Sequence, residues 1–223
     1  MGKRTCYIVG AGSFDGFLSL PQPGDLVIAA DGGYRYLKEL GIEPDVLMGD
    51  FDSLQYVPEH EHLLRHPTVK DDSDMALAVA YGQEHGYERF FLYGGLGGAR
   101  MDHTIANIQL LCGLSRGGAE SYLIGQGNVM TCLTEERIRF GPEAAGMLSV
   151  FSLSERATGV WERGLKYLLN GATLVFDRAL GLSNEFAGRT CSVEVQEGTL
   201  LLTWEQRNGL PAGRETVREE EKE

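Results

Sequence analysis

Hydrophobic and polar positions follow two different patterns along this chain, and the change falls near Glu135. Before it, short runs of apolar, β-branched and aromatic residues predict strands, and stretches with apolar side chains at helical spacing lie between them. The predicted strands are Thr5–Val9, Leu26–Ala30, Val46–Met48, Arg89–Tyr93 and Ser121–Ile124, and the predicted helices are Tyr34–Leu40, Ser73–His85 and Thr104–Leu114. This alternation is typical of a parallel sheet covered by helices, in which ligands bind beyond the carboxyl ends of the strands.

After Glu135 short strands follow one another, separated by Gly and Asn turns, which predicts an all-β module. Its predicted strands are Arg137–Phe140, Met147–Leu153, Thr173–Phe176, Cys191–Gln196 and Thr199–Trp204. We therefore predict the α/β class, with an N-terminal parallel-sheet α/β domain over residues 1–134 and a smaller all-β sandwich domain over residues 135–210. Residues 211–223 are charged and almost free of large apolar side chains, so we expect a frayed tail there.

Composition narrows the class of protein. Of 223 residues, 43% are hydrophobic and 23% charged, which supports a buried core and excludes a wholly disordered chain. A net charge of −12 makes a nucleic-acid partner unfavourable, and no apolar run reaches the length of a membrane span. The residues before the first strand show no cleavage pattern, so we expect no signal peptide. The four cysteines lack the close spacing of a zinc knuckle. We interpret them as buried thiols of a cytoplasmic protein.

Aspartate is concentrated in the first half, because ten of the eleven aspartates lie between Asp15 and Asp102. Asp50 and Asp52 follow the strand Val46–Met48, and residues two apart in extended backbone point to the same side, with Cα atoms about 6.5–7 Å apart. Two like charges at that distance favour a cation beside them, and Mg²⁺ prefers such oxygen ligands. An Asp-rich turn that caps a helix is the alternative.

A second acidic cluster, Asp71, Asp72 and Asp74, opens the predicted helix that begins at Ser73, and Lys70 precedes it. Asp71 and Asp74 are three residues apart and share one face of a first helical turn. Acids at a helix N-terminus complement the helix dipole without any ligand. Three acids within four residues are more than capping requires, so this cluster is a second candidate site.

A glycine-rich segment, Gly94–Gly98, ends a strand and precedes a helix. Such a segment lets backbone N–H groups approach a phosphate, and the guanidinium of Arg100 offers donors that suit phosphate oxygens. Asp102 either caps the helix or reaches a metal or a nucleophile. A tight crossover between strand and helix is the alternative use of these glycines.

Weaker signals lie elsewhere. Asp31 and Gly32 also end a strand and open a helix, so Asp31 either bonds a ribose or caps the helix. In the β module, Tyr167 offers a ring on which a flat heterocycle can stack, and Ser183 with Asn184 can bind its polar edge. Taken singly, these three residues are also ordinary in the core and turns of a sandwich.

Taken together, these segments resemble the thiamine pyrophosphokinase family. The matching segments are Ala30–Gly33, Pro44–Asp45, Gly49–Ser53, Lys70–Asp71, Ser73–Asp74, Gly94–His103, Gly164–Tyr167 and Ser183–Asn184. They span nearly the whole chain apart from the tail, and Gly-Asp-Phe-Asp-Ser is the specific motif among them. Two positions depart from the family pattern: Ala99 is an extra residue before Arg100, and Tyr167 stands where some members carry Trp.

The resemblance implies an enzyme that transfers the pyrophosphoryl group of ATP to the hydroxyl of thiamine, giving thiamine diphosphate and AMP. It also implies a homodimer whose site lies between the subunits. In this interpretation the metal ligands for Mg²⁺ are Asp50, Asp52 and Asp74; the ATP-binding residues are Asp31, Gly32, Lys70, Gly97, Gly98 and Arg100; and the thiamine-binding residues are Tyr167, Ser183 and Asn184. Either Asp74 or Asp102 would accept the proton of the attacking hydroxyl, and Arg100 would assist catalysis at the phosphates.

Two other functions are compatible with parts of the chain. A Rossmann-like oxidoreductase or methyltransferase would use Gly10–Gly16, but Asp15 stands where the dinucleotide fingerprint needs its third glycine. A non-catalytic nucleotide-binding module would need no metal cluster. The surplus of aspartate disfavours both functions.

Overall fold

The computed structural model describes residues 4–51, 54, 56–65, 72–97 and 100–217, which divide into two compact units. The first unit comprises Met1–Leu111 and Ala119–Gln126, and the second comprises Cys112–Gly118 and Gly127–Glu223. By this division the strand β7 (Asn128–Thr134) belongs to the second unit, whereas the sequence analysis places it in the α/β domain.

The first unit is built on a parallel sheet with the strand order β4-β3-β2-β1-β5-β6. Its strands are β1 (Thr5–Val9), β2 (Leu26–Ala30), β3 (Val46–Gly49), β4 (Leu63–Arg65), β5 (Arg89–Tyr93) and β6 (Glu120–Gly125). All residues of β1, β2 and β3 are buried, as expected for parallel strands covered on both faces. The predicted parallel-sheet α/β fold is therefore confirmed.

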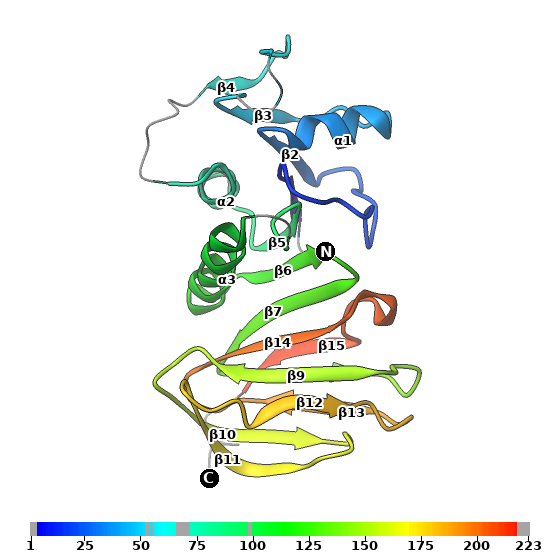
Figure 1. The fold of residues 1–223 in the computed structure, drawn as a ribbon, viewed down its shortest axis with the longest axis vertical. Coiled ribbons are helices and arrows are strands. Elements are labelled where there is room, and N and C mark those ends of the chain that lie inside the picture. The colour runs from blue at the N-terminus through cyan, green and yellow to red at the C-terminus, as the bar shows by residue number, and fades with distance from the viewer. Residues whose placement is uncertain (1–3, 52–53, 55, 66–71, 98–99, 218–223) are drawn as a thin grey trace. The chain divides into compact units, whose positions relative to one another are not determined.

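Three helices connect these strands: α1 (Gly33–Glu39), α2 (Asp74–Glu84) and α3 (Met101–Arg116). The crossover β2-α1-β3 runs toward one edge of the sheet, while β4-α2-β5 runs toward the other. Right-handed crossovers therefore place α1 on one side and α2 and α3 on the other, as Figure 1 shows. The direction reverses between β1 and β5, and ligands of open α/β sheets bind at the carboxyl ends of the strands flanking such a point.

The second unit contains two antiparallel sheets, with strand orders β7-β14-β9-β12 and β11-β10-β13-β8-β15 (Figure 1). The strands after β7 are β8 (Glu136–Phe140), β9 (Met147–Ser152), β10 (Arg156–Arg163), β11 (Leu169–Val175), β12 (Gly181–Glu185), β13 (Cys191–Glu194), β14 (Thr199–Glu205) and β15 (Gly213–Thr216). Buried side chains such as Trp204, Val150 and Val193 come from both sheets. This arrangement confirms the predicted all-β sandwich.

The expectation of a frayed tail from Pro211 is wrong for the part of the tail that the structure describes. Strand β15 pairs with β8, and Arg214 donates to the Glu136 carboxylate (Nε–Oε1 2.9 Å) and to the Cys132 carbonyl (Nη2–O 2.7 Å). A charged segment can form an edge strand when its side chains find partners, and charges are common on edge strands. Charge density alone therefore did not distinguish an edge strand from a disordered end.

The four cysteines carry free thiols: Cys6, Cys132 and Cys191 are buried and Cys112 is half-buried. Burial raises the pKa of the Cys6 and Cys132 thiols far above the ordinary range, so both are protonated at physiological pH. The interpretation as core thiols is confirmed for these residues. Within the described part of the chain, none of the helices combines the length and the apolar character needed to traverse a bilayer.

Candidate active site

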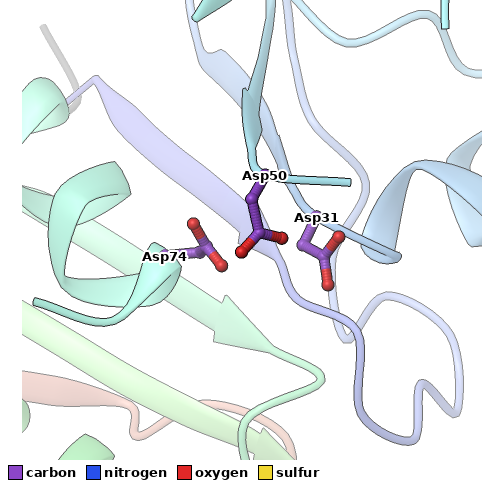
Figure 2. A group of neighbouring side chains, drawn as sticks. All are labelled: Asp31, Asp50 and Asp74. Carbon is purple, nitrogen blue, oxygen red and sulfur yellow. The ribbon is translucent and has the colours of Figure 1, made fainter. Parts of the chain in front are cut away.

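Three carboxylates converge at the carboxyl-terminal edge of the parallel sheet (Figure 2). Asp31 follows β2, Asp50 follows β3, and Asp74 is the first residue of α2. One carboxylate oxygen from each of the three lies within 4.8 Å of the other two. We call Asp31, Asp50 and Asp74 the acidic group.

The backbone at the ends of β2 and β3 brings Asp31 and Asp50 together. The N–H of Asp31 donates to the carbonyl of Met48 (2.7 Å), which joins the two strand ends. Gly49 has a φ of 144°, and a Cβ at that position would lie 3.1 Å from the Asp31 backbone. A glycine before Asp50 is therefore required by both the conformation and the close approach.

Asp74 reaches the acidic group from the start of α2. Ser73 caps this helix, because its side-chain oxygen accepts a hydrogen bond from the N–H of Ala76 (3.2 Å). The cap fixes where the helix begins and so places Asp74 in its first turn, where the helix dipole favours a negative charge. The Ser73 cap therefore both begins the helix and places Asp74 in the acidic group.

The composition of the acidic group determines its chemistry. Asp31 is only 7% exposed, and Asp50 and Asp74 are half-buried, so mutual repulsion is poorly screened by water. Carboxylate oxygens from three chain segments are the donor set that a hard divalent cation such as Mg²⁺ prefers. The residues present therefore fit a Mg²⁺ ion.

The acidic group contains one residue that was not predicted as a metal ligand. The sequence analysis assigns Asp31 to the nucleotide, whereas the structure places it beside Asp50 and Asp74. Asp52, predicted as a ligand, lies outside the described residues, as do Lys70 and Gly98. The available signal for Asp31 was its place after β2, because neighbouring parallel strands end at the same edge of a sheet.

Gly94–Gly97, which we call the glycine loop, packs against the loop that follows β1. The N–H of Gly10 donates to the Tyr93 carbonyl (2.8 Å), and the N–H of Gly12 donates to the Gly94 carbonyl (3.0 Å). A Cβ on Gly94 would lie 2.4 Å from the Gly10 carbonyl oxygen. These glycines therefore permit two strand ends to meet at the point where the sheet reverses direction.

Helix α3 braces the glycine loop from the other side. The Gly97 N–H donates to Thr104 Oγ1 (3.0 Å), and Asn107 Nδ2 donates to the Gly95 carbonyl (2.8 Å). The Gly97 N–H is thus engaged inside the protein, although the sequence analysis expects it to face a phosphate. Gly32, which is also predicted to contact the nucleotide, is the buried residue that precedes α1.

Arg100 and Asp102 are exposed and paired with each other. The Arg100 guanidinium donates from Nη2 (2.7 Å) and Nε (3.3 Å) to Asp102 Oδ2, and from Nε to Oδ1 (3.0 Å). This hydrogen bonding lowers the pKa of Asp102 to about 2. An ionised carboxylate held by an arginine is a weak base. Of the two candidate bases, Asp74 alone belongs to the acidic group.

The three predicted thiamine contacts lie in the second unit, and Asn184 organises them. Asn184 is 3% exposed, and its Oδ1 accepts from the N–H groups of Tyr167 (3.0 Å) and Glu185 (2.8 Å). Its Nδ2 donates to the Tyr167 carbonyl (2.7 Å) and to the Glu162 carboxylate. Both hydrogens and both acceptor positions of this amide are therefore occupied within the protein.

Tyr167 and Ser183 are exposed, unlike Asn184. The Tyr167 ring is 58% exposed, with the Lys166 ammonium 5.4 Å from its centroid. Ser183 has a φ of 59° where β12 departs from regular pairing with β9, and its N–H donates to Ser149 Oγ (3.0 Å). These two side chains are available to a ligand, whereas the Asn184 amide is engaged beneath them.

Glu162 of β10 is a candidate that the sequence analysis missed. Its side chain is 1% exposed, and burial raises the pKa of this carboxyl to about 7, although the hydrogen bond from Asn184 lowers it. In the sequence it stands between Trp161 and Arg163 and looks like an ordinary surface acid of a strand. Only the three-dimensional contact with Asn184 reveals it.

The raised pKa of Glu162 predicts a pH dependence of stability. The folded state binds this proton more tightly than the unfolded state, so the stabilisation is fully present below the ordinary pKa of 4.5 and is lost as pH rises through about 7. Relative to Glu162→Gln, which does not titrate, the wild-type free energy of unfolding should fall by about 3 kcal/mol across this window. Denaturant unfolding at pH 4.5, 6 and 8 checks this, and parallel curves for the two proteins would contradict it.

Known proteins resemble this chain in both units. A family model described as "Thiamin pyrophosphokinase, catalytic domain" matches residues 17–123, and one described as "Thiamin pyrophosphokinase, vitamin B1 binding domain" matches residues 135–200. The thiamine pyrophosphokinase of Bacillus subtilis is 27% identical over 184 residues, covering 79% of this chain and 86% of that protein.

Solved structures show the same fold. The crystal structure of the Bacillus subtilis thiamine pyrophosphokinase has a TM-score of 0.77 at 24% identity and covers 91% of this chain and 99% of the other. That of the Geobacillus thermodenitrificans protein has a TM-score of 0.75 at 25% identity and covers 90% and 97%. Because the two family models together match most of its residues, this chain belongs to the thiamin pyrophosphokinase family.

Proposed function

We propose that the acidic group and the glycine loop carry out the reaction of this family, which is transfer of the pyrophosphoryl group of ATP to the hydroxyl of thiamine, giving thiamine diphosphate and AMP. The observation that carries the proposal is the convergence of Asp31, Asp50 and Asp74 at the carboxyl-terminal edge of the parallel sheet. The alternative functions, an oxidoreductase, a methyltransferase or a non-catalytic module, do not require three converging carboxylates.

The acidic group would hold Mg²⁺, since its three carboxylates supply hard oxygen ligands and repel one another without a cation. A bound Mg²⁺ ion neutralises charge on the phosphates during an in-line displacement. Asp52 follows Asp50 by two residues, and we retain it as a proposed fourth ligand.

Asp74 is our preferred acceptor for the proton of the thiamine hydroxyl. It lies in the acidic group, whereas the exposed Asp102 carboxylate is outside that group and is hydrogen-bonded to Arg100. We assign Asp102 instead to orienting Arg100, whose guanidinium, with Lys70, would contact the phosphates of ATP.

The loops at the reversal point of the sheet would bind the nucleotide. The glycine loop and the Gly10–Gly12 segment lack side chains where they meet, so the backbone is the surface presented there. Bonding between the two loops, and from Thr104 and Asn107, keeps that surface rigid. A rigid backbone surface at this place in the fold suits the phosphates of ATP, and Gly98 is the proposed contact there. Because the Gly97 N–H is bound to Thr104 and Gly32 is buried, we propose that these two glycines shape the surface rather than donate to a phosphate.

The second unit would bind thiamine through Tyr167 and Ser183. The exposed Tyr167 ring can stack on a flat heterocycle, and the Ser183 hydroxyl can bind its polar edge. Asn184, whose amide is fully engaged within the unit, would hold both in place. Its role is therefore proposed to be indirect.

We further propose a homodimer in which the acids of one subunit and the thiamine contacts of the other form each site. The acidic group belongs to the first unit and Tyr167 and Ser183 to the second, so a complete site requires both kinds of unit. Two-fold dimers are the commonest soluble assemblies. The free cysteines support a cytoplasmic location, where thiols stay reduced.

The experiment that tests the function is consumption of ATP in the presence and absence of thiamine. With Mg²⁺ present, ATP should be consumed only when thiamine is added, and removal of Mg²⁺ by a chelator should stop the reaction. Consumption of ATP that does not depend on thiamine would contradict the proposed substrate.

A further inference from the structure

We propose that Glu162 is a positioning residue of the thiamine subsite, because it accepts from the amide of Asn184, which in turn holds the backbone N–H and carbonyl of Tyr167. This inference rests on the proposed function, which places thiamine against Tyr167 and Ser183. It adds a buried residue that belongs to the opposite sheet of the sandwich and is linked to the subsite through Asn184.

The contacts form a chain from the interior to the surface. The Glu162 carboxylate accepts from Asn184 Nδ2, and the same nitrogen donates to the Tyr167 carbonyl (2.7 Å). Asn184 Oδ1 accepts from the Tyr167 N–H (3.0 Å) and the Glu185 N–H (2.8 Å). The Asn184 side chain thus holds both the N–H and the carbonyl of Tyr167, as an adjacent strand would.

Glu162 completes the hydrogen bonding of the Asn184 amide, whose orientation Tyr167 and Glu185 set. The two N–H groups of Tyr167 and Glu185 require an acceptor, so Oδ1 must face them and Nδ2 must face inward. The inward Nδ2 hydrogen is buried and needs an acceptor of its own, which Glu162 supplies. Removing that acceptor leaves a buried donor unsatisfied, and the amide can recover a partner only by leaving its bonds with Tyr167.

The residues opposite Glu162 do not explain why a carboxyl group is buried at this position. The residues opposite it on the neighbouring strands are Leu169 of β11 and Val193 of β13, both apolar. Oxygen Oε1 is buried, and among the described residues it has no hydrogen-bond partner. Gly181 leaves the room for this oxygen, since a Cβ there would lie 3.3 Å from it. A carboxyl group in such a place is costly, and its bond with Asn184 is the contact that accounts for it.

The test compares Glu162→Leu, which removes the acceptor, with Glu162→Gln, which retains an oxygen for Asn184. We expect Glu162→Leu to raise KM for thiamine about tenfold, while kcat and KM for ATP change less than about twofold. Glu162→Gln should stay within about threefold of wild type. Because Asn184 carries the effect, adding Glu162→Leu to Asn184→Ala should not speed amide exchange at Tyr167 and Glu185 any further.

A matched control separates positioning from simple loss of stability. Val160 lies on the same strand and is fully buried, and the hydrogen bonds described for Asn184 do not involve it, so Val160→Ala weakens the sandwich through loss of apolar packing. It should leave KM for thiamine unchanged. If Glu162→Leu does not fold, Glu162→Met, which is more flexible and whose thioether sulfur accepts only weakly, takes its place.

A second measurement does not depend on activity. Amide hydrogen exchange at Tyr167 and Glu185 should be at least about tenfold faster in Glu162→Leu than in wild type, and unchanged relative to the rest of the sandwich in Val160→Ala. If wild type shows no turnover of thiamine, the proposed function fails, and the exchange result still decides the role of Glu162. Normal exchange at both amides, or an unchanged KM for thiamine in an active Glu162→Leu protein, would overturn the inference.

Discussion

Asp50→Asn should lower the rate of thiamine diphosphate formation at least about 100-fold at saturating substrates while the protein stays folded. The substitution keeps the shape of the side chain but removes one negative charge from the acidic group, which would hold Mg²⁺. Because like charges repel, the variant should also be slightly more stable than wild type in the absence of metal. Initial rates at several Mg²⁺ concentrations, together with a thermal unfolding scan, measure both effects.

Asp72→Asn is the matched control for this prediction. Asp72 precedes α2 two residues before Asp74, is exposed, and is not a member of the acidic group. The same loss of charge two residues from Asp74, but outside the acidic group, should therefore change the rate less than about twofold. If Asp50→Asn keeps more than a tenth of the wild-type rate at low Mg²⁺, the acidic group is not the metal site.

Mixing two inactive variants should restore about a quarter of the wild-type specific activity if each site is shared between subunits. The variants are Asp50→Asn, which damages the acidic group, and Asn184→Ala, which damages the thiamine subsite. Random mixing makes about half of the dimers mixed. In a mixed dimer one site then carries both lesions and the other carries neither, so half the sites of half the dimers are intact.

A control for subunit exchange is needed in the mixing experiment. Two differently tagged wild-type proteins, unfolded and refolded together, should give dimers that carry both tags. With exchange established, absence of recovery in the mixture of variants would show that each site is built within one chain. An equal mixture of wild type with the double variant should give about a quarter of the wild-type specific activity, because both sites of every mixed dimer then carry a lesion; sites built within one chain would give about half.

Strands of the parallel sheet were the most predictable part of the fold. The predicted bounds of β1, β2 and β5 agree with the structure, because strands buried on both faces appear in the sequence as continuous apolar runs. Strand β12, with the sequence Gly-Leu-Ser-Asn-Glu, was not predicted, since it has no β-branched residues and is held by pairing with β9. Its position depends on contacts between residues that are distant in the sequence.

The candidate site was predictable in its residues and less so in their roles. Asp50 and Asp74 were expected to lie together, whereas the place of Asp31 depends on the order of β2 and β3 and on the close approach at Gly49. Asn184 was singled out, but its hydrogen bonds to Tyr167 and Glu162 depend on contacts across two sheets. The type of a residue suggests what it can bind, and only the fold shows what it already binds.

The reaction itself is tested most directly by following the β-phosphorus of ATP. With ATP labelled at that position, thiamine and Mg²⁺, we expect the label to appear in thiamine diphosphate together with an equal amount of unlabelled AMP, as separated by chromatography. The Asp50→Asn protein should produce neither product above background. Labelled ADP formed together with thiamine monophosphate would mean that only the terminal phosphoryl group moves, and it would contradict the proposed pyrophosphoryl transfer.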